Sequence, residues 1–257
     1  MILRGNFFSQ ELEMETGLTI LAPDKLSGKS CKVIYLLHGI CGRSGDWIDY
    51  TLLPNFSRDY RAIFVMPEVA RSFYSDMKHG LNYFSYITEE LPVMVGGLLN
   101  ISQQRDDTAI IGSSMGGYGA LKAALAKPHR YGFCGAFASP CLMLKENLEY
   151  SQGAKHFKEL FGERLFKDFQ AVLGENIDWN PKEDVVELAK AVKDNAHKPR
   201  LYLACGTSDP FYADNKRFQD VLHNLNYNFT FDEWPGNHNW DFFNEALKRS
   251  LQHLFNH

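Results

Sequence analysis

The sequence of 257 residues lacks most of the features that mark secreted or membrane-spanning chains. Its five cysteines are an odd number and form no Cys-x-x-Cys pair, which argues against a disulfide framework and favours reduced, mostly buried thiols. No segment approaches the roughly 18 uncharged apolar residues of a membrane span, and the first residues lack the apolar core of a secretory signal. We therefore expect a cytoplasmic protein with no membrane association.

An excess of basic residues is also missing. The formal net charge is −4 and no long basic run occurs, so nucleic acid is not an expected partner. Neither a His-Glu-x-x-His motif nor clustered Cys and His spacing predicts a metal site, and no cofactor is expected. The remaining composition, with 45% hydrophobic and 23% charged residues, is that of a globular protein with ample length for a core, and it is compatible with a homo-oligomer.

Short apolar runs alternate with helical patterns along the chain. Several runs, such as "KVIYLLHG" and "AIFVMPE", are apolar almost throughout, as in strands buried on both faces of a parallel sheet. The alternation predicts an α/β fold, with a mostly parallel central sheet flanked by helices. The predicted strands are Leu18–Ala22, Val33–His38, Ala62–Pro67, Ala109–Gly112, Cys134–Ser139, Arg200–Cys205 and Asn228–Glu233, and the predicted helices are Phe84–Leu99, Gly117–Ala126, Asn215–Asn224 and Trp240–Phe255.

One segment, from Leu142 to Lys198, is helical in pattern and has no convincing strand. Its last helix is expected to begin at Glu183 or Asp184, where acidic residues suit the positive end of the helix dipole. Because the segment lies between two predicted strands, we expect a single domain over residues 1–257 with a small helical cap at about 142–198. A crossover elaboration that covers no site is the alternative.

The segment "GSSMG" (Gly112–Gly116) joins a predicted strand to a predicted helix and matches the pattern G-x-S-x-G. In such a turn the central serine is strained, and side chains two residues before and after it would collide with the strand and the helix. Ser114 has glycine at both of these positions, whereas Ser113 would have Ile111 and Met115. The spacing therefore makes Ser114 the candidate nucleophile and leaves Ser113 to support the turn or line the pocket. A purely structural turn is the alternative for the motif alone.

A serine nucleophile needs a base and an acid that orients the base. His238 lies in "EWPGNHNWDFF", where a Pro-Gly-Asn loop between a strand and a helix can direct an imidazole toward the serine. Asp209 follows the apolar run "RLYLACG", and Asp214 is its competitor, although it suits the first turn of the next helix. The order Ser114, Asp209, His238 is that of the α/β-hydrolases, and we expect these three residues to be catalytic.

An ester hydrolase also needs N–H donors for the oxyanion. One is expected from the residue after the nucleophile, Met115, and the other from the loop in "YLLHGICGRSGDW". Ile40 is the expected second donor and Cys41 the next choice. His38 is expected to hold this loop by hydrogen bonds rather than to catalyse.

These motifs resemble those of the esterase D-like α/β-hydrolases, in particular the tributyrin esterase branch. That group also includes feruloyl and acetylxylan esterases and S-formylglutathione hydrolase. The resemblance implies an α/β-hydrolase fold and the roles already given to the triad and to the two backbone donors. The loop His-Gly-Ile-Cys-Gly departs from the Leu-Ser-Gly and Thr-Cys context of S-formylglutathione hydrolases, which argues against glutathione-thioester chemistry. The matching segments are "YLLHGICGRSGDW", "LNYFSYITEELP", "IIGSSMGGYGALKAAL", "LACGTSDPFYADNKRF" and "WPGNHNWDFF".

The predicted function is that of a serine carboxylesterase acting on small-molecule esters with short acyl groups, such as acetyl, butyryl or hydroxycinnamoyl. Cys41, Phe73 and Tyr74 are candidate substrate contacts, with ordinary packing as the alternative for the two aromatic residues. A thioesterase or acyltransferase using the same triad is a second interpretation. A non-catalytic binding protein with a hydrolase fold is a third, and the complete set of Ser, Asp and His counts against it.

Overall fold

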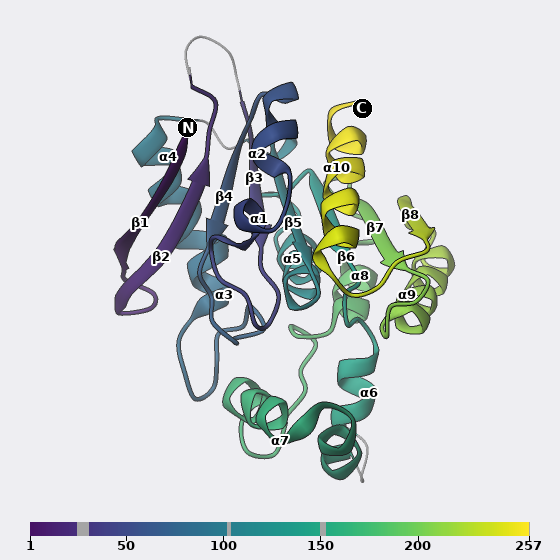
Figure 1. Cartoon of the computed structure of the whole chain (residues 1–257). Helices are drawn as coiled ribbons and strands as arrows, with labels where there is room; N and C mark the ends of the chain where they lie inside the picture. Colours follow the sequence, from purple (N-terminus) through teal and green to yellow (C-terminus); the bar gives the residue numbers. More distant parts are fainter. Residues whose placement is uncertain (25–30, 102–103, 150–152, 257) are drawn as a thin grey trace.

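The computed structural model describes residues 1–24, 31–101, 104–149 and 153–256 (Figure 1). Within these ranges the chain forms an eight-stranded sheet in the order β1-β2-β4-β3-β5-β6-β7-β8. Strands β3 to β8 run parallel to one another, whereas β2 is antiparallel to both of its neighbours, β1 and β4. The predicted mostly parallel α/β sheet is therefore confirmed. The strands are β1 Ile2–Ser9, β2 Met14–Leu21, β3 Lys32–Leu37, β4 Ala62–Pro67, β5 Thr108–Ser113, β6 Phe133–Phe137, β7 Arg200–Gly206 and β8 Phe229–Trp234.

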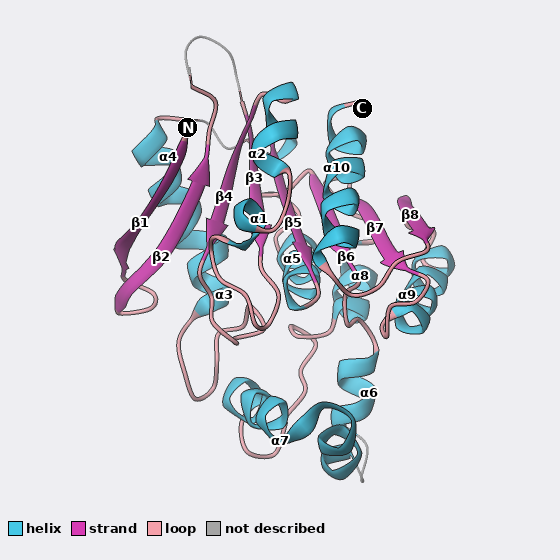
Figure 2. Ribbon diagram, viewed as in Figure 1, coloured by secondary structure: helices cyan, strands magenta, loops and turns pink. Residues whose placement is uncertain are grey.

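Helices cover both faces of the sheet, because the central strands are apolar on both sides (Figure 2). In β3, Val33, Tyr35 and Leu37 join the core beneath α4, α5 and α8. Ile34 and Leu36 point to the opposite core, beneath α1, α2 and α10. The helices are α1 Asp46–Asp49, α2 Leu53–Phe56, α3 Tyr83–Ser85, α4 Leu91–Leu99, α5 Met115–Ala126, α6 Met143–Glu149, α7 Gly153–Leu173, α8 Val185–Val192, α9 Tyr212–Asn224 and α10 Trp240–Phe255.

The strand β4 and the helix α10 have the bounds that the sequence predicts, and the other predicted elements are found with ends shifted by a few residues. The predicted helix Phe84–Leu99 is interrupted by a π-helical turn between α3 and α4. Strand β1 was not predicted, because it is an exposed edge strand without the apolar pattern of a buried strand. None of the helices in the described ranges combines the length and apolar character of a bilayer span.

The predicted helical segment contains α6, α7 and α8 between β6 and β7; its residues 150–152 lie outside the described ranges. Helix α7 is broken at Gly162, where φ is 86°. Asp184 rather than Glu183 caps α8, because its side chain accepts hydrogen bonds from the N–H groups of Val186 and Glu187. In Figure 1 the helices α6 and α7, here called the cap, lie beyond the ends to which the arrowheads of the parallel strands point.

The turn between β5 and α5 brings three backbone segments into close contact. A Cβ atom at Gly112 would lie 2.2 Å from the carbonyl oxygen of Gly116, and one at Gly116 would lie 2.3 Å from that of Leu37. Ser114, between the two glycines, adopts φ 55° and ψ −123°, a conformation that L-residues rarely hold. Its N–H donates to the carbonyl oxygen of Phe137 at 2.8 Å, which fixes the turn to β6.

Substitution of Gly116 by alanine tests this close contact. Because the new Cβ would meet the backbone of β3, we expect Gly116→Ala to lower the free energy of unfolding by about 3 kcal/mol or more. Gly97→Ala in α4 is the matched control, since no atom lies within 4 Å of its added Cβ and alanine favours a helix. Urea unfolding should show a large loss for the first variant and no loss for the second. Equal midpoints for Gly116→Ala and the unmodified protein would contradict the geometry.

Candidate active site

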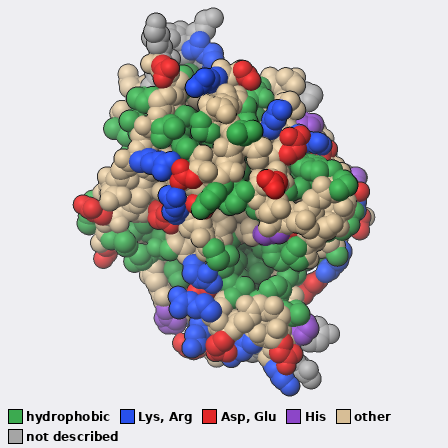
Figure 3. Space-filling model, viewed as in Figure 1, with side chains coloured by type: hydrophobic (Ala, Val, Ile, Leu, Met, Phe, Trp, Pro, Cys, Tyr) green, Lys and Arg blue, Asp and Glu red, His purple; other side chains and the backbone are tan. Residues whose placement is uncertain are grey.

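Ser114 lies where two cavities meet at the carboxyl edge of the sheet, beneath the cap. Figure 3 shows a hollow on this face, between the sheet and the cap, with hydrophobic side chains gathered around it. The apolar cavity has a volume of about 60 Å³, and the open cavity has one of about 560 Å³. Ser114 and Ile40 line both. The apolar cavity is lined by Ile40, Phe73, Ser114, Met115, Pro140, Met143, Leu144, Phe157, Phe161, Leu165 and Phe211, and the open cavity by Gly39, Ile40, Cys41, Gly42, Arg43, Asp46, Tyr50, Ser113, Ser114, His238, Asn239, Trp240 and Phe243.

The structure brings Asp209 and His238 together. Nδ1 of His238 lies 2.8 Å from Oδ2 of Asp209, whose side chain is fully buried. A carboxylate can only accept at this contact, so Nδ1 is the donor, and in the neutral imidazole Nε2 then has the lone pair. The second carboxylate oxygen of Asp209 accepts from the N–H of Phe211 at 2.8 Å, which holds the carboxylate in place.

The loops after β7 and β8 are held against each other by their backbones. The N–H of Thr207 donates to Trp234, and the N–H of Ser208 donates to Gly236, each at 3.0 Å. A Cβ at Gly206 would lie only 2.4 Å from the carbonyl oxygen of Gly236, so this approach requires glycine at position 206. The Pro-Gly-Asn sequence before His238 thus allows the loop of the histidine to meet the loop of Asp209.

Two aromatic rings set the orientation of the His238 imidazole. Phe211 and Phe243 meet it edge to face, with ring centroids 5.1 and 5.2 Å away. The histidine remains partly open to the open cavity, with 27% of its side chain exposed. A base in this position can reach solvent while its plane is restrained.

The two candidate oxyanion donors, Ile40 and Met115, line the apolar cavity together with Ser114. Met115 is the first residue of α5, so its N–H has no acceptor within the helix and lies at the positive end of the helix dipole. Ile40 belongs to the loop after β3, and a Cβ at Gly39 in that loop would lie 3.6 Å from the Cβ of Ser114. The positions of Ile40 and Met115 suit the predicted roles.

His38 is buried and holds the loop of Ile40, as the sequence suggested. Its Nδ1 lies 2.7 Å from the carbonyl oxygen of Gly39, and its Nε2 accepts from the N–H of Val69 at 3.2 Å. Beside it, the Glu68 carboxylate accepts from the N–H of Ser44 at 2.9 Å, which holds the next part of the same loop. His38 therefore acts as part of the scaffold of the loop.

The three candidate substrate contacts have different positions. Phe73 lines the apolar cavity and Cys41 lines the open one, so both remain candidates. Tyr74 is completely buried, and its hydroxyl donates to the carbonyl oxygen of His38 at 2.9 Å. The prediction that Tyr74 contacts substrate is therefore wrong: the ring packs beneath the loop of Ile40 and supports it.

Asp214, the competitor of Asp209, has a different role. It lies in the first turn of α9 and accepts hydrogen bonds from the N–H groups of Cys141, Leu142 and Met143. Burial raises the pKa of its carboxyl group, and these three donors act in the opposite direction. Asp214 thus anchors the start of the cap. No local sequence pattern indicates this role, because the partners are far from Asp214 along the chain.

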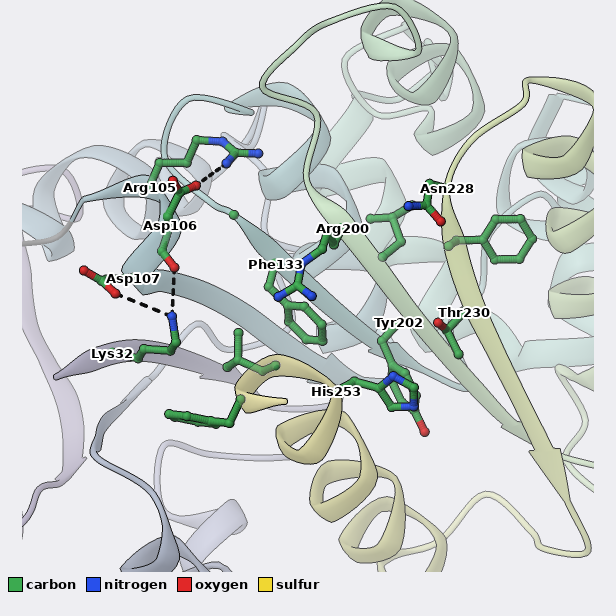
Figure 4. A pocket seen from close by; sticks show the side chains of 15 residues that line it. Lys32, Arg105, Asp106, Asp107, Phe133, Arg200, Tyr202, Asn228, Thr230 and His253 are labelled. Atoms are coloured by element: carbon green, nitrogen blue, oxygen red, sulfur yellow. Dashed lines mark hydrogen bonds and ion pairs between the residues drawn. The ribbon is translucent and has the colours of Figure 1, made fainter. Parts of the chain in front are cut away.

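The largest cavity described lies at the opposite edge of the sheet (Figure 4). It has a volume of about 850 Å³ and lies between the amino ends of parallel strands and the end of α10. Lys32, Arg105 and Arg200 give it a polar, partly cationic lining, and Arg200 lies over the ring of Phe133. None of the predicted catalytic residues is among those lining it, so size alone does not identify the active site.

Known structures with this sheet and turn superpose on nearly the whole chain. The fluorophosphonate-binding serine hydrolase F of Staphylococcus aureus, solved with substrate bound, is 27% identical with a TM-score of 0.84, and the match covers 99% of this chain and 98% of that one. An S-formylglutathione hydrolase of the same organism, solved as the apoenzyme, is 26% identical with a TM-score of 0.83 and the same coverage. The fold is therefore that of the α/β-hydrolases, and the class is that of the serine hydrolases.

The family follows from the sequence as a whole. The esterase family described as "Putative esterase" matches residues 9–254, and the chain belongs to it. An acetyl esterase of Caldicellulosiruptor saccharolyticus is 28% identical over an alignment of 268 positions, which covers 98% of this chain and 97% of that protein. The protein is a carboxylic ester hydrolase, and the predicted resemblance to the esterase D-like hydrolases is confirmed.

The two aspartates can be distinguished by substitution. We expect Asp209→Asn to lower kcat for p-nitrophenyl butyrate by a factor on the order of 10³–10⁴, because His238 loses the partner that fixes its tautomer. Asp214→Asn should instead lower the melting temperature and change kcat by less than about tenfold, because it loosens the start of the cap. Steady-state kinetics and thermal unfolding of both variants provide the measurement. The reverse pattern would assign the catalytic role to Asp214.

Proposed function

We propose that the protein is a serine carboxylesterase that hydrolyses small-molecule esters with short acyl chains. In this proposal Ser114 is the nucleophile, His238 the base and Asp209 the acid that orients the base. The main support is the position of Ser114, which lies on a strained turn between a small apolar cavity and an open cavity that contains His238. The hydrogen bond between His238 and Asp209 favours the tautomer of the neutral imidazole that the reaction needs.

The reaction follows from these positions. Nε2 of His238 takes the proton of the Ser114 hydroxyl as Oγ bonds to the ester carbonyl carbon, and the carbonyl electron pair moves to oxygen. The N–H groups of Met115 and Ile40 stabilise that oxyanion. The tetrahedral intermediate then expels the alcohol, which receives the proton from His238 and leaves an acyl group on Ser114. Water, deprotonated by the same histidine, releases the carboxylic acid and restores the serine.

The two cavities suggest which part of the ester lies where. A cavity needs roughly 10–15 Å³ to hold one water-sized group, so about 60 Å³ holds only a few such groups, the size of a short acyl chain. Its walls are almost entirely apolar, which suits a hydrocarbon. The open cavity contains Arg43, Asp46 and Tyr50 and has room for a larger, polar alcohol. We therefore assign the acyl group to the apolar cavity and the leaving alcohol to the open one.

A thioesterase or acyltransferase is the second candidate, because only the leaving group or the acceptor would differ. The match to an S-formylglutathione hydrolase structure favours it. The loop His-Gly-Ile-Cys-Gly, which departs from that group, favours the oxygen esterase. The ratio of kcat/KM for an oxygen ester and a thioester of the same acid distinguishes the two.

Covalent labelling tests the assignment of the nucleophile. A fluorophosphonate probe should label the unmodified protein, and Ser114→Ala should abolish labelling, because the probe phosphonylates an activated serine. Ser113→Ala is the matched control: Ser113 is buried at the end of β5 and should not be needed for labelling. Gel fluorescence of the labelled proteins is the measurement. Persistent labelling of Ser114→Ala, or none of the unmodified protein, would refute the proposal.

Acyl-chain length tests the assignment of the apolar cavity. We expect kcat/KM for p-nitrophenyl esters to fall for chains longer than about six carbons, because the cavity is small. Leu165→Ala, which removes a cavity wall on α7, should raise the hexanoate to acetate ratio of kcat/KM by about tenfold. The control is Leu160→Ala on the same helix, since Leu160 is exposed and does not line the cavity. An unchanged ratio in Leu165→Ala would place the acyl chain elsewhere.

A further inference from the structure

A buried ion pair lies behind the proposed acyl site, on the helix that follows Ser114. Lys122 is on α5, among apolar residues in the sequence. Its side chain is only 1% exposed, which is unusual for a lysine. Its Nζ lies 2.6 Å from Oε2 of Glu183 and 2.6 Å from Oγ of Ser75. The aromatic rings of Phe84 and Tyr118 face the ammonium group at 5.3 and 5.5 Å from their centroids.

Burial and the pairing of Lys122 with Glu183 act in opposite directions on the pKa of each group. Burial lowers the pKa of Lys122, and the Glu183 carboxylate opposes this effect. Burial would raise the pKa of Glu183, but the charge of Lys122 and hydrogen bonds from Lys122 and Ser75 outweigh it and lower that pKa. A buried ion pair often contributes no more stability than apolar residues of similar volume. Its presence behind the site therefore points to a role in holding particular groups in place.

Ser75 connects this pair to a strained corner of the chain. Its hydroxyl accepts from Lys122 at 2.6 Å and donates its single proton to Oε2 of Glu183 at 2.7 Å, and Ser75 directly follows Phe73 and Tyr74 in the chain. Phe73 and Tyr74 have φ values of 51° and 54°, a left-handed conformation that is costly for residues with large side chains. Such a corner persists only where its surroundings hold it.

The corner of Phe73 and Tyr74 contributes to the apolar cavity and supports the loop of Ile40. The ring of Phe73 lines the apolar cavity and packs on Phe169 of α7 at a centroid distance of 4.2 Å. The hydroxyl of Tyr74 supports the loop of Ile40 through the carbonyl oxygen of His38. A shift of the corner would therefore move a wall of the apolar cavity.

Glu183 brings the end of the cap segment to the same point. It directly precedes Asp184, the N-cap of α8. The hydroxyl of Tyr118, which lies one helical turn after Ser114, donates to the carbonyl oxygen of Glu183 at 2.7 Å. The ion pair thus joins the serine helix, the Phe73 corner and the chain that leaves the cap.

We infer that Lys122 and Glu183 are positioning residues that set acyl-chain selectivity by holding the Phe73 wall of the apolar cavity. They touch no substrate and act through Ser75, which directly follows Phe73 and Tyr74 and so fixes the end of their strained corner. This inference rests on the proposed esterase function and on the assignment of the acyl group to the apolar cavity.

The experiment compares acyl selectivity in variants of the pair. Lys122→Met leaves Glu183 buried without its partner and can lose stability for that reason alone. The double variant Lys122→Met/Glu183→Gln removes both charges, and Ser75→Ala removes only the bridging hydroxyl. Lys145→Met is the matched control, because it breaks the neighbouring ion pair of Lys145 with Asp184 and leaves the corner intact.

The readouts are kcat and KM for p-nitrophenyl acetate and butyrate, labelling by a small fluorophosphonate, and urea unfolding. In the double variant we expect the butyrate to acetate ratio of kcat/KM to change by about tenfold, mainly through KM for butyrate. Labelling and kcat for acetate should stay within about threefold of the unmodified protein, because the triad is untouched. Ser75→Ala should shift the ratio in the same direction by a smaller factor, and Lys145→Met should leave it unchanged.

Two results would overturn the inference. One is a folded double variant and a folded Ser75→Ala that both keep the original ratio, which would leave the pair a purely structural role. The other is an equal shift in Lys145→Met, which would indicate a general loosening of the cap. Failure of the proposed function is recognised separately, because the unmodified protein would then show no labelling that depends on Ser114. In that case the inference fails together with the proposed function.

Discussion

The close contact of three backbones at the β5–α5 turn is the constraint on which the active site depends. Gly112 meets Gly116 and Gly116 meets the end of β3, at distances that exclude any side chain. This contact forces Ser114 into its unusual conformation and directs the first N–H groups of α5 toward the same point. It also sets the loop after β3 beside Ser114, so that one steric fit positions the proposed nucleophile and the proposed oxyanion donors.

In the sheet around this turn, the residues that form the cores and the residues proposed for catalysis occupy different positions. The central strands alternate between two apolar cores, and each core is covered by its own helices. The loops at the carboxyl edge are thereby free to carry polar residues, as in other parallel sheets. Asp209 and His238 come from neighbouring loops at this edge, and backbone hydrogen bonds hold these loops together. The cap adds apolar walls to the cavity beside Ser114. The two cavities that meet at Ser114 thus have different origins: one lies largely under the cap, and the other opens between the loops.

The sequence was sufficient to predict what depends on neighbouring residues. The apolar strands, the glycine spacing around Ser114 and the Pro-Gly-Asn loop before His238 each have a local pattern, and the order of Ser114, Asp209 and His238 could be read along the chain. Contacts between distant segments had no such pattern. Asp214 binds backbone groups about 70 residues earlier in the chain, and Lys122 meets Glu183 from a position 61 residues away. Tyr74 looked like a pocket residue because its buried hydroxyl partner, the carbonyl of His38, belongs to another loop.

The two ends of the cap segment are tied to each other and to the body of the protein. Asp214 holds the residues that lead into α6, and Lys145 on α6 bonds to Asp184 at the start of α8, 2.9 Å away. The chain therefore enters the cap and leaves it, into α8, at nearly the same place. A segment attached in this way can be lengthened, shortened or exchanged during evolution without moving the loops that hold Ser114, Asp209 and His238. Divergence of substrate range among relatives could then proceed by replacing one contiguous stretch of the gene.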